Sequence, residues 1–484
     1  MTRSASATAQ QRRRAGAGRS RPTRVGVISL GCAKNLVDTE VMLGHLDRAG
    51  CEFVRDVREA ELILINTCGF IEAAREESIQ TILEAAELKR TGGLKRLVVA
   101  GCLVQRYRDE LRQALPEVDA FVGLDELDRV VAGIEDGQPL RPSAARSDLP
   151  LLPAGVVQAP TPAAVAAWHR STYLYDHATP RRTATPSFSA YVKIAEGCDH
   201  TCAFCAIPSF RGTFRSRRPE SVLEEARALC SRGVREISLI AQDSSHYGRD
   251  LGRSEGLAEL LERLDAVEDL RWIRVHYLYP NTVTARLIES MARSERVVPY
   301  VDLPLQHADP RVLARMRRGG SPEAHLRLLE RFRTAMPDVA LRSTFIVGFP
   351  GETPREFAAL LDFVRQARFR HLGVFTYSHE EGTPALALAD DVPAAVKAER
   401  RDALLSLQQG IAFEHNRGMI GRRVEVLVEG AHPETEHLLA GRTAGQAPDV
   451  DGQVLINDGL AAPGSFVPVE ITDTAGYDLV GRVV

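Results

Sequence analysis

The sequence predicts an α/β protein with an N-terminal open parallel α/β domain, a central partial (β/α) barrel and a small C-terminal β-barrel. Its 484 residues are enough for about three domains. Hydrophobic residues make up 44% and charged residues 26%, which is typical of globular proteins. β-Branched apolar runs alternate with amphipathic segments in two separate regions, and only short runs follow them. This pattern excludes a fibrous chain and a single small binding module.

The N-terminal region predicts a basic tail over residues 1–23. The first 24 residues contain seven arginines, no acidic residue and no apolar stretch, so we expect disorder, with a transit peptide as the alternative, and no secretory signal. No apolar run is long enough for a membrane helix. We therefore expect a cytoplasmic protein that keeps its eight cysteines reduced, so their spacing indicates metal or catalytic chemistry before disulfides. The net charge of −3 excludes wholesale phosphate binding.

The first folded domain is predicted over residues 24–140. Four apolar runs, each read as a strand, alternate with helical segments, which indicates βαβ units and a parallel sheet. The runs lie at 24–32, 60–68, 96–102 and 120–124. Residues 141–182 are rich in Pro, Ala and Thr without a sustained period, and this composition predicts a linker or covering loop.

The second domain is predicted over residues 183–412. Six strand candidates separated by helical segments are fewer than the eight of a closed TIM barrel, so we expect a partial barrel with its site at the strand C-termini. These candidates lie at 189–198, 235–243, 271–278, 300–306, 341–350 and 371–378. A helix near 396–414 precedes residues 415–484, where short strands and turns predict the small β-barrel.

Three cysteines directly after the first barrel strand carry the strongest signal. Cys198, Cys202 and Cys205 have the spacing CxxxCxxC. Three thiolates from one short loop can hold three irons of a cubane cluster and leave the fourth iron open. The alternative is structural zinc, but that needs four closed ligands, and His200 lies inside the loop where binding the same ion would be strained.

At this motif the chain resembles the radical S-adenosylmethionine superfamily, over about residues 186–407. The resemblance implies that Cys198, Cys202 and Cys205 bind a [4Fe-4S] cluster whose open iron chelates S-adenosyl-L-methionine. It also places Phe204 near the adenine, although ordinary core packing explains one aromatic residue equally well.

A second cysteine triad is spread over the first domain. Cys32, Cys68 and Cys102 each follow an apolar strand, and the carboxyl ends of parallel strands share one edge, so we expect them to converge on a second cluster. Flanking glycines would allow a bulky ligand to approach the backbone. Cys51 and Cys230 lack this placement and are interpreted as small core residues.

This half of the chain resembles the amino-terminal domain of the methylthiotransferases. The strings ISLGCAKNLVDTE, NTCGFIEAAREES, GCLVQRY and EGCDHTCAFCAIPSFRGTFRSR are similar to the RimO type, which methylthiolates an aspartate of small-subunit ribosomal protein twelve. The resemblance implies an auxiliary [4Fe-4S] cluster that supplies sulfur, two S-adenosylmethionine molecules per reaction, and a flavodoxin- or ferredoxin-like electron donor. Ala33 departs from the proline usual in that group, which concerns loop rigidity only.

Further site residues are predicted at strand ends. Gln242, Gly348, Gly351 and Glu352 are assigned to cofactor binding, although the Gly-rich turn also fits a plain strand-to-helix connection begun by Pro354. Residues assigned to substrate binding are Arg211, Arg215, Gln306 and Tyr377, with Asp243 as a further residue at a strand end. Most runs of charge are solvated faces, which is the competing interpretation of the arginines.

The C-terminal barrel resembles a TRAM domain, a module associated with RNA. Residues 416–484 contain five arginines and no lysine against ten acidic residues. This charge repels a phosphate backbone and attracts a basic ribosomal protein, so direct RNA binding is not favoured. A barrel that only packs on the core, a tRNA methylthiotransferase, a zinc- or RNA-binding scaffold and an unrelated radical enzyme remain the alternatives.

Overall fold

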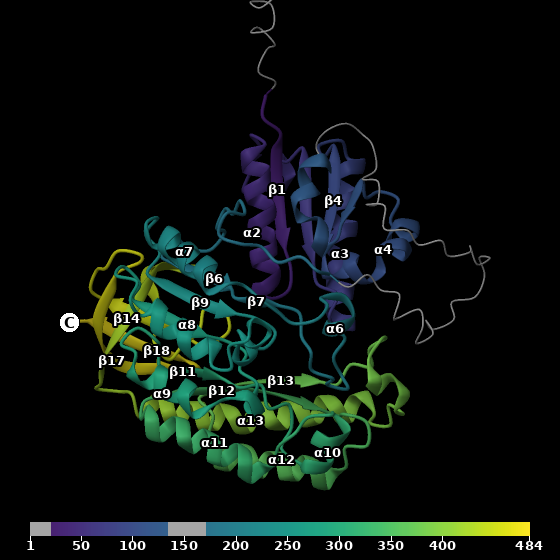
Figure 1. Cartoon of the computed structure of the whole chain (residues 1–484). Helices are drawn as coiled ribbons and strands as arrows, with labels where there is room; N and C mark the ends of the chain where they lie inside the picture. Colours follow the sequence, from purple (N-terminus) through teal and green to yellow (C-terminus); the bar gives the residue numbers. More distant parts are fainter. Residues whose placement is uncertain (1–20, 134–170) are drawn as a thin grey trace, which may run out of the picture.

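The computed structural model describes residues 21–133 and 171–484. Most of the predicted basic tail and residues 141–170 of the predicted linker lie outside these ranges. Figure 1 shows three parts: the N-terminal domain at the top, the central α/β region below it, and the C-terminal barrel at one side of that region.

The N-terminal domain is a five-stranded parallel sheet with the order β2-β1-β3-β4-β5. Its strands are β1 (Arg24–Ser29), β2 (Glu52–Phe53), β3 (Leu62–Thr67), β4 (Arg96–Gly101) and β5 (Ala120–Val122). Its helices are α2 (Ala33–Arg48), α3 (Glu72–Arg90) and α4 (Cys102–Ala114), with short 3₁₀ segments η1 (Val57–Glu59) and η2 (Leu124–Gly133). The predicted strands are all present; the two-residue edge strand β2 was not predicted.

Both faces of this sheet are buried, which explains why its strands are apolar without alternation. Along β3, Leu62 and Leu64 pack with α2, whereas Ile63 and Ile65 pack with α3 and α4. Side chains alternate between the faces of a strand, so each helical layer needs its own set of apolar residues. The sheet therefore holds its carboxyl edge rigidly between two cores.

The central region contains the six predicted parallel strands, divided into two sheets. Their orders are β10-β9-β6 and β11-β12-β13, and between β10 and β11 the one bridge described joins Ile273 to Val297. The strands are β6 (Ser189–Lys193), β9 (Glu236–Ile240), β10 (Trp272–Val275), β11 (Tyr300–Asp302), β12 (Ala340–Val347) and β13 (His371–Thr376). The open, partial barrel is confirmed.

Helices cover the outside of these strands (Figure 1). They are α7 (Pro219–Cys230), α8 (Gly256–Leu264), α9 (Ala285–Arg293), α10 (Pro310–Arg315), α11 (Pro322–Ala335), α12 (Pro354–Ala367) and α13 (Ala394–Arg417). The short helix α6 (Ile207–Phe210) instead packs against Cys102 and Leu124 of the N-terminal domain. Short 3₁₀ segments are η3 (Ser244–His246), η4 (Arg249–Leu251), η5 (Pro280–Thr282) and η6 (Pro384–Ala387). A two-stranded antiparallel sheet, β7 (Ala195–Glu196) with β8 (Arg215–Ser216), brackets the CxxxCxxC loop.

The C-terminal strands form a closed barrel in the order β14-β15-β16-β18-β17. They are β14 (Arg423–His432), β15 (Thr435–Thr443), β16 (Val454–Asp458), β17 (Phe466–Ala475) and β18 (Asp478–Val483). The barrel packs on the central region through a shared apolar cluster in which Trp272 and Phe466 meet edge to face, with ring centroids 4.8 Å apart. The predicted small barrel is confirmed.

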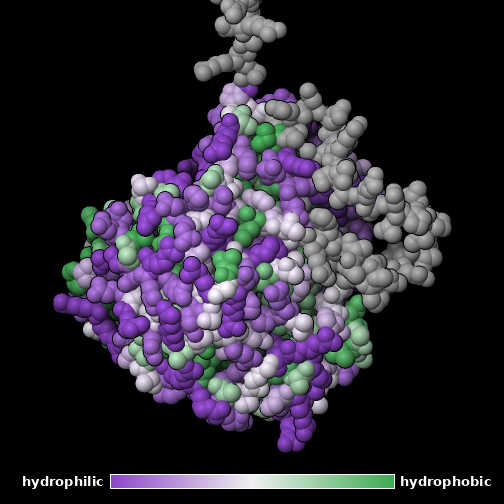
Figure 2. Space-filling model, viewed as in Figure 1, coloured by the Kyte–Doolittle hydropathy of each residue, from purple (hydrophilic) through white to green (hydrophobic). Residues whose placement is uncertain are grey.

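The surface is mostly hydrophilic on the face drawn in Figure 2, where hydrophobic residues form small separate spots. Two of the most exposed large apolar side chains are Leu460 and Val450, both in loops of the barrel region. Scattered exposed apolar residues are normal for a globular protein. In the two described ranges, none of the helices has the length and apolar character needed to cross a membrane.

Candidate functional site

The auxiliary triad, Cys32, Cys68 and Cys102, lies at the carboxyl edge of the N-terminal sheet. Cys32 is the N-cap of α2, Cys68 follows β3, and Cys102 begins α4 directly after β4. A Cβ added at Gly31 would lie 3.3 Å from Cys68 Sγ, so the loops carrying Cys32 and Cys68 touch. The parallel sheet therefore brings together three residues that are far apart in the sequence.

Electrostatics differ within the auxiliary triad. Burial raises the pKa of the Cys102 thiol to about 12, an effect that Arg211 opposes and that negative charge on Cys68 and Cys32 reinforces. The pKa of Cys32 is lowered, because Lys34 and Arg211 together outweigh the effect of burial. Negative charge on Cys32 raises the pKa of both Cys68 and Cys102, so these thiols lie close enough to interact.

The radical triad, Cys198, Cys202 and Cys205, lies in the loop between β7 and α6. Its backbone is anchored by hydrogen bonds from the Cys198 amide to Gly212 O at 3.1 Å and from the Ala203 amide to Met316 O at 2.9 Å. Burial raises the pKa of Cys198 to about 12 and also raises the pKa of Cys205, which negative charge on Cys202 raises further. A metal ion that coordinates a thiol deprotonates it outright, even where burial raises the pKa of the thiol.

Each triad supplies three cysteine thiols, the ligand type of an iron-sulfur cluster. Within residues 21–133 and 171–484, no three His, Cys, Asp or Glu side chains are placed to hold one metal ion. In a cubane cluster each thiolate binds its own iron, so the sulfurs need not meet at one point. His200 Nε2 donates to Asp243 Oδ2 at 2.7 Å, and the ring stacks on Tyr279 with centroids 3.9 Å apart, so the imidazole is already engaged.

An arginine contacts one sulfur of each triad. Arg211 Nη2 lies 3.0 Å from Cys102 Sγ, and Arg318 Nη1 lies 3.6 Å from Cys202 Sγ. Charge and hydrogen bonds to ligand sulfurs are among the factors that set the reduction potential of an iron-sulfur cluster. Each triad therefore has its own cation in place to stabilise added negative charge.

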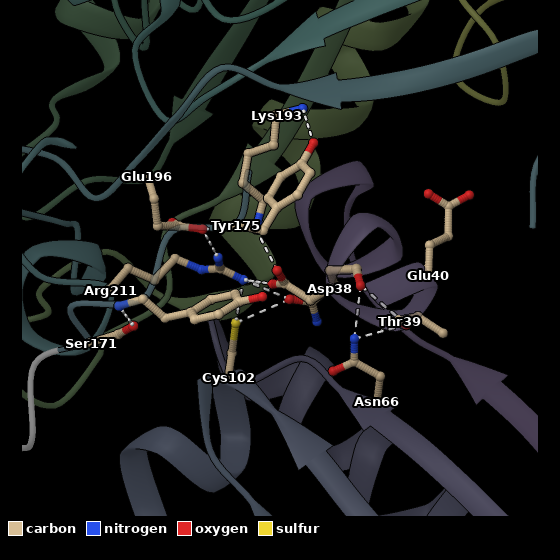
Figure 3. A network of polar contacts seen from close by, with 12 residues as sticks. Asp38, Thr39, Glu40, Asn66, Cys102, Ser171, Tyr175, Lys193, Glu196 and Arg211 are labelled. Atoms are coloured by element: carbon tan, nitrogen blue, oxygen red, sulfur yellow. Dashed lines mark hydrogen bonds and ion pairs between the residues drawn. The ribbon is translucent and has the colours of Figure 1, made fainter. Parts of the chain in front are cut away.

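A buried network of charged side chains connects the two domains at this point (Figure 3). Arg211 donates to Glu196 Oε2 at 2.8 Å, and its other terminal nitrogen lies 3.3 Å from Asp38 Oδ2. Lys193 binds the same two carboxylates. Asn35 Oδ1 accepts from Arg211 at 2.7 Å. The positive charges of Lys193 and Arg211 thus neutralise the two carboxylates at the interface between α2 and the β6–β8 region. All four side chains are nearly inaccessible to solvent.

The two triads are neighbours in space. Cys102 shares a small buried cluster with Ala206 and Phe210, and Ala206 directly follows Cys205 in the chain. Residues 171–182, predicted as linker, pack along the same interface, where Arg181 binds Glu40 and Glu225 with 2.5 Å contacts. Both triads therefore face the junction of the two domains.

Gln242 is positioned beside the radical triad. Its Nε2 donates to Glu196 Oε1 at 2.9 Å, while its Oε1 is buried without a described hydrogen-bond partner. An unsatisfied buried acceptor at a strand end is a place where a bound ligand can donate. The amino group of S-adenosylmethionine is one such donor. The assignment of Gln242 to cofactor binding stays a prediction.

The Gly-rich turn serves its own helix. Glu352 accepts hydrogen bonds from the amides of Gly348 and Phe349, and burial raises its pKa. Thr353 and Glu356 form a capping box at the start of α12, a motif whose side-chain cap contributes about 1 kcal/mol. The alternative interpretation as a strand-to-helix connection accounts for these contacts, and a cofactor contact by Gly348, Gly351 or Glu352 stays a prediction.

The remaining predicted side chains are mostly engaged within the protein. Phe204 packs with Tyr377 in a cluster near α10, and the Tyr377 hydroxyl lies 3.1 Å from His379 Nδ1. Arg215 donates to backbone oxygens, one of which is Thr213 O at 2.5 Å. Gln306 has a φ of 71° just beyond β11 and its side chain is half-buried, so of the predicted substrate residues it is among the more open.

Sequence reasoning missed the residues that join the triads. Asp38 and Lys193 complete the buried network, Arg318 contacts Cys202, and Lys34 lies over the ring of Tyr277 with its Nζ 3.6 Å from the centroid. One signal was present: Lys34 and Asp38 lie two and six residues after Cys32, on the first turns of a helix that starts at a predicted ligand. The partners from the second domain carried no such signal.

Replacing Gly101 tests how tightly the auxiliary triad is built. Gly101 has a φ of 100°, and an added Cβ would lie 2.7 Å from Thr67 O, so we expect Gly101→Ala to destabilise the fold by about 1–3 kcal/mol and to lower iron bound at Cys102. The measurement is urea unfolding together with iron content. Gly92 has the same φ with open space around it, so Gly92→Ala is the control and should keep full iron content.

Known proteins are similar to this chain over nearly its whole length. A ribosomal protein uS12 methylthiotransferase RimO from Anaeromyxobacter sp. (strain K) is 50% identical over 462 residues, covering 96% of this chain and 93% of the relative. The RimO protein of Koribacter versatilis (strain Ellin345) is 46% identical and covers 96% of this chain and 97% of its own. The chain belongs to the RimO family.

Family models match all three parts of this RimO family member. They are the uncharacterized protein family UPF0004 over residues 24–123, the radical SAM superfamily over residues 192–364 and the TRAM domain over residues 420–484. Among solved structures, the radical S-adenosylmethionine methyltransferase TsrM from Kitasatospora setae is similar with a TM-score of 0.51, 15% identity, and coverage of 75% of this chain and 77% of that one. That likeness concerns the fold.

Proposed function

We propose that this protein methylthiolates the β-carbon of an aspartate residue in ribosomal protein uS12. The observation that carries the proposal is the pair of cysteine triads facing one domain junction, with Cys102 packed against Ala206 beside Cys205. Membership of the RimO family, whose relatives are named ribosomal protein uS12 methylthiotransferases, supports the same reaction.

Two [4Fe-4S] clusters and S-adenosylmethionine are the cofactors we propose. Cys198, Cys202 and Cys205 would hold the radical cluster, and Cys32, Cys68 and Cys102 the auxiliary cluster. When bound, these groups would supply radical chemistry from one S-adenosylmethionine, and a sulfur that would be methylated at the expense of a second. A C–H bond beside a carboxylate has no useful acid–base route, which is why a cofactor must provide the reactivity.

The protein's own residues would position and shield these groups. Gln242 offers its unpaired Oε1 to the amino group of S-adenosylmethionine, and Arg211 and Arg318 neutralise charge at one sulfur of each triad. The buried network of Asp38, Glu196, Lys193 and Arg211 fixes the distance between the domains, because each cation bonds to carboxylates on both sides. Fixed geometry between reacting groups contributes strongly to rate.

The charge of the barrel supports a protein substrate over a nucleic acid. One arginine of residues 416–484, Arg442, is buried in an ion pair with Glu236, and one acid, Asp451, is buried against Arg342. Four arginines and nine acidic residues remain, so the excess of negative charge persists outside the core. A basic ribosomal protein is attracted to such a surface, whereas tRNA is repelled. A flavodoxin- or ferredoxin-like protein would supply the electron.

Iron counting tests the cofactor content. We expect the protein purified without oxygen to contain about eight irons with matching sulfide, and Cys198→Ala/Cys202→Ala/Cys205→Ala to retain about four. The same loss is expected for the corresponding triple variant of the auxiliary triad. A reconstituted wild type with about four irons would contradict sulfur insertion, and zinc without iron would favour the scaffold alternative.

Product analysis tests the substrate. The reconstituted protein, given S-adenosylmethionine and a reductant, is expected to add a methylthio group to one aspartate of purified uS12, as seen by peptide mass spectrometry. Bulk tRNA treated in parallel should remain unmodified. Methylthio groups on tRNA and none on uS12 would overturn the proposal in favour of a tRNA methylthiotransferase.

A further inference from the structure

Lys34 differs from the other cations between the two domains. Its Nζ lies over the ring of Tyr277, 3.6 Å from the centroid, and within the described parts of the chain no carboxylate lies within 4.0 Å of it. Lys193 and Arg211, by contrast, are each bound to two carboxylates. An ammonium group has three donors, and an aromatic face satisfies its charge only in part. Lys34 acts electrostatically on Cys32, whose pKa it lowers, and its ammonium group has donors left for a substrate carboxylate.

The other arginines near the triads are engaged. Arg318 donates to Pro304 O at 2.6 Å and contacts Cys202, and Arg342 is bound to Asp451. Arg211 is 2% exposed, with its terminal nitrogens on Glu196, Asn35 and Cys102. Lys34, by comparison, is half-buried, so part of its side chain remains accessible.

The backbone of Tyr277 is strained in a way that fixes this arrangement. Tyr277 has a φ of 61°, a region that bulky residues rarely adopt. Its amide donates to Asp302 Oδ2 at 3.2 Å, and its carbonyl accepts from the Ser244 amide at 2.9 Å. Strain of this kind persists where the surroundings hold it, and it occurs often at functional sites. Here it lies just beyond the carboxyl end of β10, where barrel enzymes place site residues.

The segment from Tyr277 to Tyr279 spans the two triads. Lys34 lowers the pKa of the Tyr277 hydroxyl, whereas burial and negative charge on Cys32 raise it. The ring of Tyr277 therefore lies close to the auxiliary triad. Two residues on, the ring of Tyr279 lies 4.4 Å from the guanidinium carbon of Arg318, which contacts Cys202. A substrate side chain placed between the triads would therefore meet Lys34.

We propose that Lys34 is a specificity-determining residue that binds the side-chain carboxylate of the substrate aspartate, with Tyr277 as the platform that holds its ammonium group. This inference rests on the proposed function. The β-carbon that is modified is bonded to the carboxyl carbon, so fixing the carboxylate fixes the reacting C–H bond. The auxiliary triad begins two residues before Lys34, which places the sulfur source and the carboxylate site on the same helix start.

Binding of uS12 without turnover tests this role. The reconstituted protein is incubated with methionine and 5′-deoxyadenosine, and its affinity is measured for uS12 and for uS12 with the modified aspartate replaced by asparagine. We expect wild type to prefer the aspartate form by about 10- to 100-fold, the range of a hydrogen bond between charged groups. Lys34→Met should abolish the preference, and Lys34→Arg should restore part of it.

Three controls make the outcome decisive. Lys89→Met removes a lysine paired with Asp119 at 2.6 Å on the surface and should leave the preference unchanged. Iron content shows whether Lys34→Met keeps its clusters; if it does not, Tyr277→Leu, which leaves Lys34 in place, is expected to reduce the same preference. An unchanged preference in an iron-loaded Lys34→Met would overturn the inference, whereas a wild type that neither binds nor modifies uS12 would instead overturn the proposed function.

Discussion

Arg211→Met is expected to destabilise the protein by about 3–5 kcal/mol and to lower iron bound at the auxiliary triad. The substitution keeps a long apolar side chain but removes the cation that Glu196, Asp38 and Cys102 share. Lys193 alone would then face two buried carboxylates, and a buried charge without a partner is strongly destabilising. Urea unfolding of the anaerobically purified protein and iron analysis measure the two effects.

Two further variants separate charge from geometry. Arg211→Lys keeps the charge but lacks the planar fork that reaches Glu196, Asn35 and Cys102 together, so an intermediate loss is expected. Arg227→Met removes an arginine that pairs with Glu224 at the exposed surface and should change stability by well under about 1 kcal/mol. If Arg211→Met unfolded at the same urea concentration as Arg227→Met, the network would not hold the domains together.

The arrangement of strands was predictable because its signal is local. Ile63 and Leu64 belong to a continuous run of apolar residues, the pattern typical of a strand that is buried on both faces. Each cysteine of the auxiliary triad follows such a run. The shared carboxyl edge then follows from the parallel sheet alone. The short strand β2 escaped prediction because two residues carry no period.

The polar partners were not predictable because they depend on how two domains meet. Arg211 was expected to bind substrate, yet the structure places it 2% exposed among Asp38, Asn35 and Cys102, which are more than 100 residues away in the chain. Tyr277 was predicted within the strand candidate 271–278, but β10 ends at Val275, and hydrogen bonds to Asp302 and Ser244 from other segments hold the left-handed backbone of Tyr277. Sequence periodicity reports which face is buried and contains no information on such pairings.

Glu236→Gln is expected to loosen the C-terminal barrel from the central region, at about 3–5 kcal/mol. Glu236 is completely buried on β9 and accepts from Arg442 at 2.6 Å, from Arg274 at 3.2 Å and from Ser189 at 3.0 Å. The glutamine amide keeps the shape of the side chain but removes the negative charge that lies between the guanidinium groups of Arg442 and Arg274. Limited proteolysis after α13 and urea unfolding measure the release of the barrel.

The same residue predicts how stability depends on pH. Burial alone would raise the pKa of Glu236, but Arg442 and Arg274 outweigh it and lower this pKa to about 2, below the ordinary value of 4.5. A carboxyl whose pKa is depressed by folding stabilises the protein above its unfolded pKa, and this contribution is lost as pH falls from about 4.5 toward 2. We therefore expect the unfolding free energy of wild type to fall more steeply across this window than that of Glu236→Gln.

The matched control is Glu425, which also joins the barrel to the central region through Arg271 but is exposed. Glu425→Gln should leave the unfolding midpoint and the acid dependence close to wild type, because solvent already screens that pair. Parallel acid curves for wild type and Glu236→Gln would contradict the role of this carboxylate. A difference confined to Glu236→Gln would mean that burial, rather than the number of ion pairs, holds the acidic barrel against the first residues of the central strands.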